Sequence, residues 1–276
     1  MTDAVPPDLS SAPARGGRTG RALRSLIAPV VGLASFFVLW QLAVVVFDIP
    51  AFELPPPSRI LEAIADDPSF YLRNAWVTGR EATLGFALAL LLALLAGTVM
   101  TYSRFLERAV QPVAVLVQVT PIIAYAPAFV IWLGAGIKPI IAITTLVCFV
   151  PFLFNAVAGL RSVDPATLEV LRSVNANGRE IFWRLRLPHA LPFLFAAARI
   201  AVGLALIGAV LGEWFALVDE GLGVAIRKAL NFNDVDQLWG SILVLGFLGG
   251  SMLLVLSLAE RVALHWHPSQ VTLSGP

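Results

Sequence analysis

Apolar residues in this chain gather into six long runs, which are separated by charged segments or by segments that contain Gly and Pro. A run of about 20 apolar residues is long enough to cross roughly 30 Å of hydrocarbon as a helix. The pattern therefore predicts six transmembrane helices. Their expected ranges are 27–47, 84–102, 112–133, 137–157, 191–217 and 238–259.

The first run follows a stretch rich in Arg, as the apolar core of a secretory signal peptide also does. Its length and the lack of a small-residue cleavage pattern favour an uncleaved membrane anchor. Residues 1–24 are rich in Pro, Gly, Ser and Arg, and such a composition buries too little apolar surface to offset the chain entropy lost on folding. We expect a disordered cytoplasmic tail at 1–24 and a second cytoplasmic tail at 266–276.

The composition indicates that the lipid bilayer is the solvent of this protein. Its 276 residues are 58% apolar and 13% charged, whereas soluble globular chains average about 45–50% apolar and roughly 25% charged residues. These values exclude an ordinary soluble domain and predict an all-α membrane protein. The net charge of +1 gives no indication of nucleic-acid binding.

The basic residues are distributed unevenly between the segments that flank the six runs. With the N-terminal tail placed in the cytoplasm, twelve lie in cytoplasmic segments and six in outer segments. An excess of Lys and Arg on the cytoplasmic side is typical of membrane proteins, so both termini are expected there. The cytoplasmic set is Arg15, Arg18, Arg21, Arg24, Arg104, Arg108, Arg161, Arg172, Arg179, Arg184, Arg186 and Arg261, and the outer set is Arg59, Arg73, Arg80, Lys138, Arg227 and Lys228.

Two segments between the predicted spans are long enough to have a structure of their own. In the outer segment 48–81, Ser58 can cap a short amphipathic helix that extends to Ala65 and lies on the membrane surface. In the cytoplasmic segment 161–190, a helix can begin at Asp164-Pro165. A cluster of turn-forming residues at 175–178 should then separate it from a second helix. A solvated connecting loop is the plainer interpretation of 161–190.

The segment 161–190 resembles the loop signature of the integral-membrane permease subunits of binding-protein-dependent ABC importers. That signature is Glu-Ala-Ala, three residues, Gly and, about twelve residues later, Leu-Pro; this chain has Glu169-Val170-Leu171, Asn175 and Leu187-Pro188. Asn tolerates a left-handed conformation next best after Gly, so a turn at Asn175 is still expected. The resemblance extends over 76–265, and its other matching stretches are 120–127, 159–165, 212–213 and 221–223.

Together these stretches are similar to the nitrate/sulfonate/taurine-type branch, and the stretch 207–214 is similar to relatives that import pyrimidine or riboflavin precursors. The resemblance implies a type I ABC importer permease fold in the plasma (inner) membrane. Residues 25–75 would form the first transmembrane helix and an outer loop, and 76–265 the permease domain.

The resemblance also implies partners: a cytoplasmic ABC ATPase dimer, an extracytoplasmic substrate-binding protein and a second copy of this chain. Segment 161–190 would be the coupling loop that docks the ATPase. Its expected contact residues are Glu169, Leu171, Asn175, Ala176, Ile181 and Phe182. Because the chain has no G-x-x-x-x-G-K-[ST] motif, ATP should be bound by the partner, and the permease itself should need no cofactor.

The fifth predicted span contains two ionisable residues, Arg199 and Glu213, which are costly in hydrocarbon and normally face the interior of a bundle. On an ideal helix they lie about 40° apart in projection and roughly 21 Å apart along the axis. This spacing favours a helix that lines the translocation pathway. The alternative is that both residues anchor the span at the membrane interfaces.

Two other faces of the fifth predicted span carry residues of different size. Large apolar residues at 200, 204, 207, 211 and 214 suit lipid, whereas small residues let another helix approach closely. The small residues are Ala201, Ala205, Gly208 and Gly212.

In the third span, Pro121 and Pro127 can interrupt the helix next to a pathway, although a plain kink is the alternative for both. Pro121 is therefore a third candidate pathway residue.

Two other classes of function remain open from the residues alone: a self-contained channel or secondary carrier, and an intramembrane enzyme. Against the enzyme, His189, His265 and His267 all lie at the cytoplasmic margin of the predicted spans, and the single Cys148 has no nearby His. The motifs H-E-x-x-H and G-x-S-x-G are absent from the sequence. A transport subunit without enzymatic activity is the function that the sequence favours.

Overall fold

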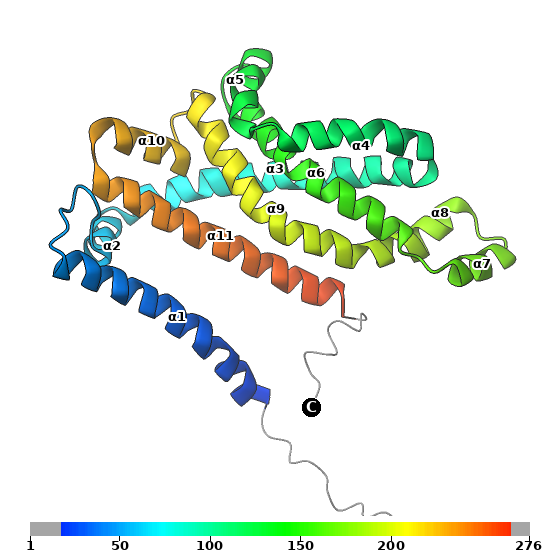
Figure 1. Cartoon of the computed structure of the whole chain (residues 1–276), viewed down its shortest axis with the longest axis horizontal. Coiled ribbons are helices and arrows are strands. Elements are labelled where there is room, and N and C mark those ends of the chain that lie inside the picture. Colours follow the sequence, from blue (N-terminus) through cyan, green and yellow to red (C-terminus); the bar gives the residue numbers. More distant parts are fainter. Residues whose placement is uncertain (1–17, 266–276) are drawn as a thin grey trace, which may run out of the picture. The chain divides into compact units, whose positions relative to one another are not determined.

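The computed structural model describes residues 18–265, with side chains from residue 27 onward, and helices are the only regular structure in that range (Figure 1). The predicted tail at 266–276 lies outside the described residues, as does 1–17 of the other tail. The chain divides into two compact units, residues 1–59 and 60–276.

The first unit contains helix α1 (Arg18–Val46), and helix α2 (Pro57–Asp66) begins near its end. The prediction of a disordered tail through residue 24 is too long, because α1 begins at Arg18, in a stretch whose Arg, Ala and Leu residues are good helix formers. Ser58 does not cap α2 from outside. It lies in the first turn, after Pro57, and its backbone N–H donates to Oε1 of Gln41 at 3.1 Å.

The second unit is built on helix α6 (Ile137–Arg161), which packs against α3 (Pro68–Tyr102) and α9 (Leu187–Phe215). The other long helix is α11 (Val235–Ala263). Two groups of short helices lie at opposite ends of these long helices in Figure 1. One end carries α10 (Leu222–Phe232), and the other carries α7 (Pro165–Ser173) and α8 (Gly178–Ile181).

Small residues allow the close packing of α6 and α9. A Cβ atom on Gly208 would lie 2.7 Å from Cα of Thr144, and one on Gly212 would lie 2.8 Å from Cα of Ile140. Ala201 and Ala205 are fully buried in the same core. The predicted packing stripe of α9 is therefore confirmed, and the glycines bring the two helix backbones into contact.

Within residues 18–265, five helices are each long and apolar enough to cross a membrane, and the pair α4 (Arg104–Val119) and α5 (Ile122–Leu133) makes a sixth span if counted together. The two helices of this pair are bent by 103°. The predicted interruption of the third span at Pro121 is therefore confirmed, and the span begins at Arg104, earlier than the expected residue 112. The break falls at Thr120 and Pro121, because proline disfavours a helical conformation in the residue before it. Pro127 lies inside α5 without ending it.

The second span also begins earlier than predicted. Helix α3 starts at Pro68, so the boundary expected at residue 76 and the second half of the expected outer segment 48–81 both fall inside a helix. Asp67 caps this helix: its carboxylate accepts hydrogen bonds from Oγ of Ser69 and the backbone N–H of Phe70, which lower the pKa of Asp67. Hydropathy misses the first turns of α3 because several of their polar residues are buried in protein.

Candidate functional site

A group of buried polar side chains surrounds the N-terminus of helix α10. The first N–H groups of a helix have no partner within the helix. Here the N–H of Gly221 donates to Oδ1 of Asn74 at 2.8 Å, and the N–H of Leu222 donates to Oγ1 of Thr78 at 2.8 Å. Both acceptors lie on α3, which therefore satisfies the first half of this helix terminus.

Glu213 on α9 satisfies the second half. Its Oε2 accepts hydrogen bonds from the N–H of Gly223 at 2.6 Å and from the N–H of Val224 at 3.3 Å. Its Oε1 accepts a hydrogen bond from the hydroxyl of Thr78 at 2.6 Å. A carboxylate at a helix N-terminus is favoured by the helix dipole as well as by these bonds. We call the group of Asn74, Thr78 and Glu213 with residues 221–224 the α10 cap.

The two glycines of this region are required by the same contacts. Gly221 has φ 130° and ψ 155°, a conformation that other residues rarely adopt, and a Cβ atom there would collide with the Glu213 carboxyl group. A Cβ atom on Gly223 would lie 2.7 Å from Oε2 of Glu213. The motif noted at 212–213 and 221–223 therefore joins a carboxylate to the backbone that it binds.

Glu81 is a second buried carboxyl group, and it adjoins Glu213. Sequence reasoning assigned Glu81 to an outer segment and did not identify Asn74 or Thr78. The signal was their spacing, because Asn74, Thr78 and Glu81 recur at helical intervals and continue the buried face of α3. Within the described residues, no group of three or more His, Cys, Asp or Glu could hold a metal ion.

The structure does not bring Arg199 and Glu213 to a common surface. The side chain of Glu213 is fully buried, whereas that of Arg199 is 59% exposed. Nη2 of Arg199 lies 2.6 Å from Oε2 of Glu260 on α11, and its Nε donates to the same oxygen at 3.2 Å. Arg199 thus joins α9 to α11, and Glu213 joins α9 to α3 and α10.

The loop 161–190 has the predicted first helix, turn and second helix. Asn175 has φ 56°, the left-handed conformation that the signature position requires. After it, Asn177 begins α8 with a capping box to Glu180, and a π-helical segment, Phe182–Arg186, leads directly into α9. The predicted second helix is therefore present from Gly178 onward, and it continues without a break into α9.

The predicted coupling residues differ in exposure. Glu169 and Asn175 are exposed, and Leu171, Ala176 and Ile181 are partly buried. Phe182 packs against a cluster formed by α6 and α9. Three large apolar side chains that sequence reasoning did not select are exposed on this loop: Val170, Val174 and Trp183. Nothing but their position in the signature loop marks them in the sequence.

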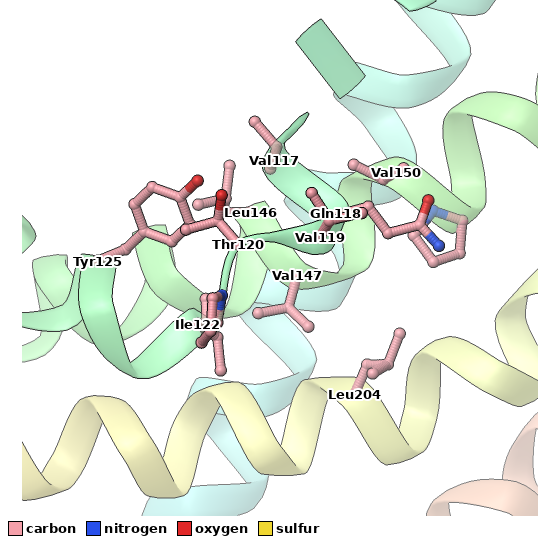
Figure 2. A pocket seen from close by; sticks show the side chains of 12 residues that line it. Val117, Gln118, Val119, Thr120, Ile122, Tyr125, Leu146, Val147, Val150 and Leu204 are labelled. Carbon is pink, nitrogen blue, oxygen red and sulfur yellow. The ribbon is translucent and has the colours of Figure 1, made fainter. Parts of the chain in front are cut away.

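The break between α4 and α5 lines a cavity of about 290 Å³ (Figure 2). Figure 2 shows Gln118, Thr120 and Tyr125 around the break, with Leu204 contributed by α9. Of the three predicted pathway residues, Pro121 lines this cavity, whereas Arg199 and Glu213 do not. Gln118 and Tyr125 were not identified from the sequence, where isolated polar residues in an apolar run carry no distinct pattern.

Comparison with known families matches residues 89–264 to the binding-protein-dependent transport system inner membrane component. The chain belongs to this family. It is a multi-pass inner-membrane permease subunit of an ABC importer and has no enzymatic role of its own. Members of the family work with an ATPase subunit and a binding protein.

Individual relatives support the same assignment. The chain is 32% identical to the formylaminopyrimidine transport permease protein ThiX of Halalkalibacterium halodurans, over 88% of this chain and 97% of the relative. It is 31% identical to the riboflavin transport system permease protein RibX of Chloroflexus aurantiacus (90% and 95% covered). It is 30% identical to the taurine transport system permease protein TauC of Escherichia coli (83% and 86% covered).

A solved structure confirms the type I importer permease fold. The permease of the MetNI methionine ABC transporter in an inward-facing conformation matches with a TM-score of 0.62. The match covers 72% of this chain and 98% of that chain, at 17% sequence identity. At this identity the likeness concerns the fold.

The role of the α10 cap can be tested at Gly221. Gly221→Ala should lower the free energy of unfolding of the purified protein, because the added methyl group displaces the Glu213 carboxylate. We expect this displacement to cost about 1–3 kcal/mol in addition to the backbone strain, which thermal unfolding measures. Gly136→Ala is the matched control. Gly136 also precedes a helix with positive φ, at 104°, but nothing lies within 4 Å of an added Cβ. Equal losses in the two variants would show that the contact with Glu213 does not matter.

Proposed function

We propose that two copies of this permease form the pathway for a small, neutral heteroaromatic solute of the pyrimidine or flavin-precursor class. An extracytoplasmic binding protein would deliver the solute, and an ATPase dimer that holds the ATP would drive its import from the cytoplasmic side, where both termini lie. The observation that carries the substrate proposal is the chemistry of the cavity at the α4–α5 break.

Broken helices at membrane depth are tolerated where they are buried in protein or line a cavity, and substrate sites of transporters are often built on them. The lining of this cavity includes the amide of Gln118, the hydroxyl of Tyr125 and several aliphatic side chains. No charged residue belongs to it. An aromatic ring can stack on Tyr125 and hydrogen-bond to Gln118, whereas a sulfonate such as taurine carries a charge that calls for a cationic partner. Two of the three relatives described above are named for heteroaromatic solutes.

The substrate proposal predicts the outcome of uptake measurements in lipid vesicles that contain the permease, its ATPase and its binding protein. Radiolabelled formylaminopyrimidine or riboflavin should accumulate with ATP, and taurine should not. Gln118→Leu should lower the uptake roughly tenfold, because one hydrogen bond to a solute contributes about 1 kcal/mol or more. Gln111→Leu is the matched control, since Gln111 is an exposed residue of the same helix and does not line the cavity. Uptake of taurine alone would overturn the proposal.

For the ATPase interface, we propose that Glu169, Leu171, Asn175 and Ala176 form the docking surface together with the exposed Val174. Helix α7 lies at the end of the long helices that is opposite to α10 (Figure 1), and Glu169, Val174 and Asn175 are exposed there. Ile181 and Phe182 would instead hold the end of the loop on the bundle, because Phe182 packs on α6 and α9. An apolar centre with a charged rim, here Glu169 and Arg172, is typical of protein interfaces.

Val174→Asp tests the docking surface, because it places a charge among apolar contacts of the interface. The variant should bind the ATPase at least tenfold more weakly, a loss of about 1.4 kcal/mol or more, without a change in the stability of the permease alone. Val174→Ile, which keeps the apolar surface, should bind normally. Affinity is measured with purified subunits in nanodiscs. Unchanged binding by Val174→Asp would exclude this surface.

A further inference from the structure

Both ends of the loop 161–190 contact the same place, the corner between α3 and α4. At the first end, the guanidinium group of Arg161 bridges two elements: Nη1 donates to Oε1 of Glu107 on α4 at 2.6 Å, and Nη2 donates to the backbone O of Met100 on α3 at 2.8 Å. The Glu107 side chain is only 19% exposed. At the other end, the guanidinium carbon of Arg186 lies 4.8 Å from the centre of the Tyr102 ring.

The corner itself has little freedom. Ser103 is the single residue between α3 and α4: its N–H donates to Val99 O at 3.1 Å, and its side chain accepts a hydrogen bond from the N–H of Leu106. The same residue thus closes the last turn of α3 and caps the first turn of α4. The end of α3 and the start of α4 are therefore joined through one hydrogen-bonded residue.

Helix α4 leads from this corner to the cavity. Its 16 residues span about 24 Å at 1.5 Å per residue. Its last turn and the break after it supply Val117, Gln118, Val119 and Thr120 to the cavity lining. Helix α4 thus connects the corner that Arg161 contacts with the break, where the chain bends by 103°.

We propose that Arg161 is a positioning residue that transmits movement of the coupling loop to α4 and so to the solute cavity. The inference rests on the proposed function, because it assumes that the loop moves with the ATPase. Arginine suits this role since its rigid fork of N–H donors reaches acceptors on two helices at once, whereas a lysine ammonium acts as a single point charge. Loss of Arg161 should therefore uncouple solute import from ATP hydrolysis.

The test compares Arg161→Gln with the wild-type complex of permease, ATPase and binding protein in vesicles. We expect the amount of assembled complex and its basal ATP hydrolysis to stay within about twofold of wild type. The solute imported per ATP hydrolysed should fall tenfold or more. The conservative Arg161→Lys should restore part of the coupling, and exchange of the pair, Arg161→Glu with Glu107→Arg, should restore more than either single change. Arg108→Gln removes an exposed charge from α4, next to Glu107, and should couple normally.

Other outcomes would overturn the inference. Normal import per ATP in Arg161→Gln would show that the bridge transmits nothing. If Arg161→Gln fails to assemble, Glu107→Leu decides, because it keeps the bond from Arg161 to Met100 and removes the side-chain acceptor on α4; normal coupling in that variant would reject the role. Any solute that the wild-type complex imports serves as the probe, so an error in the proposed substrate class leaves the test intact. ATPase binding is measured separately, so weaker binding of the ATPase can be told apart from a loss of coupling in the assembled complex.

Discussion

The N–H groups at the start of α10 have no partner within the helix, and one end of the helix bundle depends on the acceptors that other helices supply to them. A buried N–H group without a partner costs about 1–3 kcal/mol, and four consecutive groups occur here. Their acceptors come from α3 and α9, and the resulting bonds tie three helices at one point. The neighbouring glycines 221 and 223 leave the space in which the Glu213 carboxylate reaches the backbone.

The opposite end of the bundle is joined in a different way. There the connection between α3 and α4 is one residue long, and Arg161 and Arg186, at the two ends of the loop 161–190, contact residues of α3 and α4 beside it. Between the two ends, α6 and α9 touch along glycine and alanine positions and form a tightly packed centre. Helices α4 and α5 are bent by 103° at their break, and the residues around the break line the cavity proposed for the solute.

The number and approximate place of the membrane helices could be predicted because a span needs only length and hydropathy. The family was recognisable because Glu169, Asn175 and Leu187-Pro188 keep the spacing of the loop signature. The α10 cap could not be predicted in full: Asn74 and Thr78 are polar, so hydropathy placed them outside the membrane, although their helical spacing matched a buried face. The bridge from Arg161 to Glu107 joins residues 54 positions apart, which no local pattern relates.

The most direct measurement is hydrogen exchange at the backbone amides of residues 221–224, followed by mass spectrometry of the protein in nanodiscs. In wild type these amides should be protected, because each has a buried acceptor. Glu213→Leu replaces the carboxylate by an apolar side chain of similar size. In this variant the amides of Gly223 and Val224 should exchange about tenfold to a hundredfold faster, and the exchange of the amides in α6 should not change. Unchanged protection of these two amides would contradict the account that Glu213 holds α10 in place.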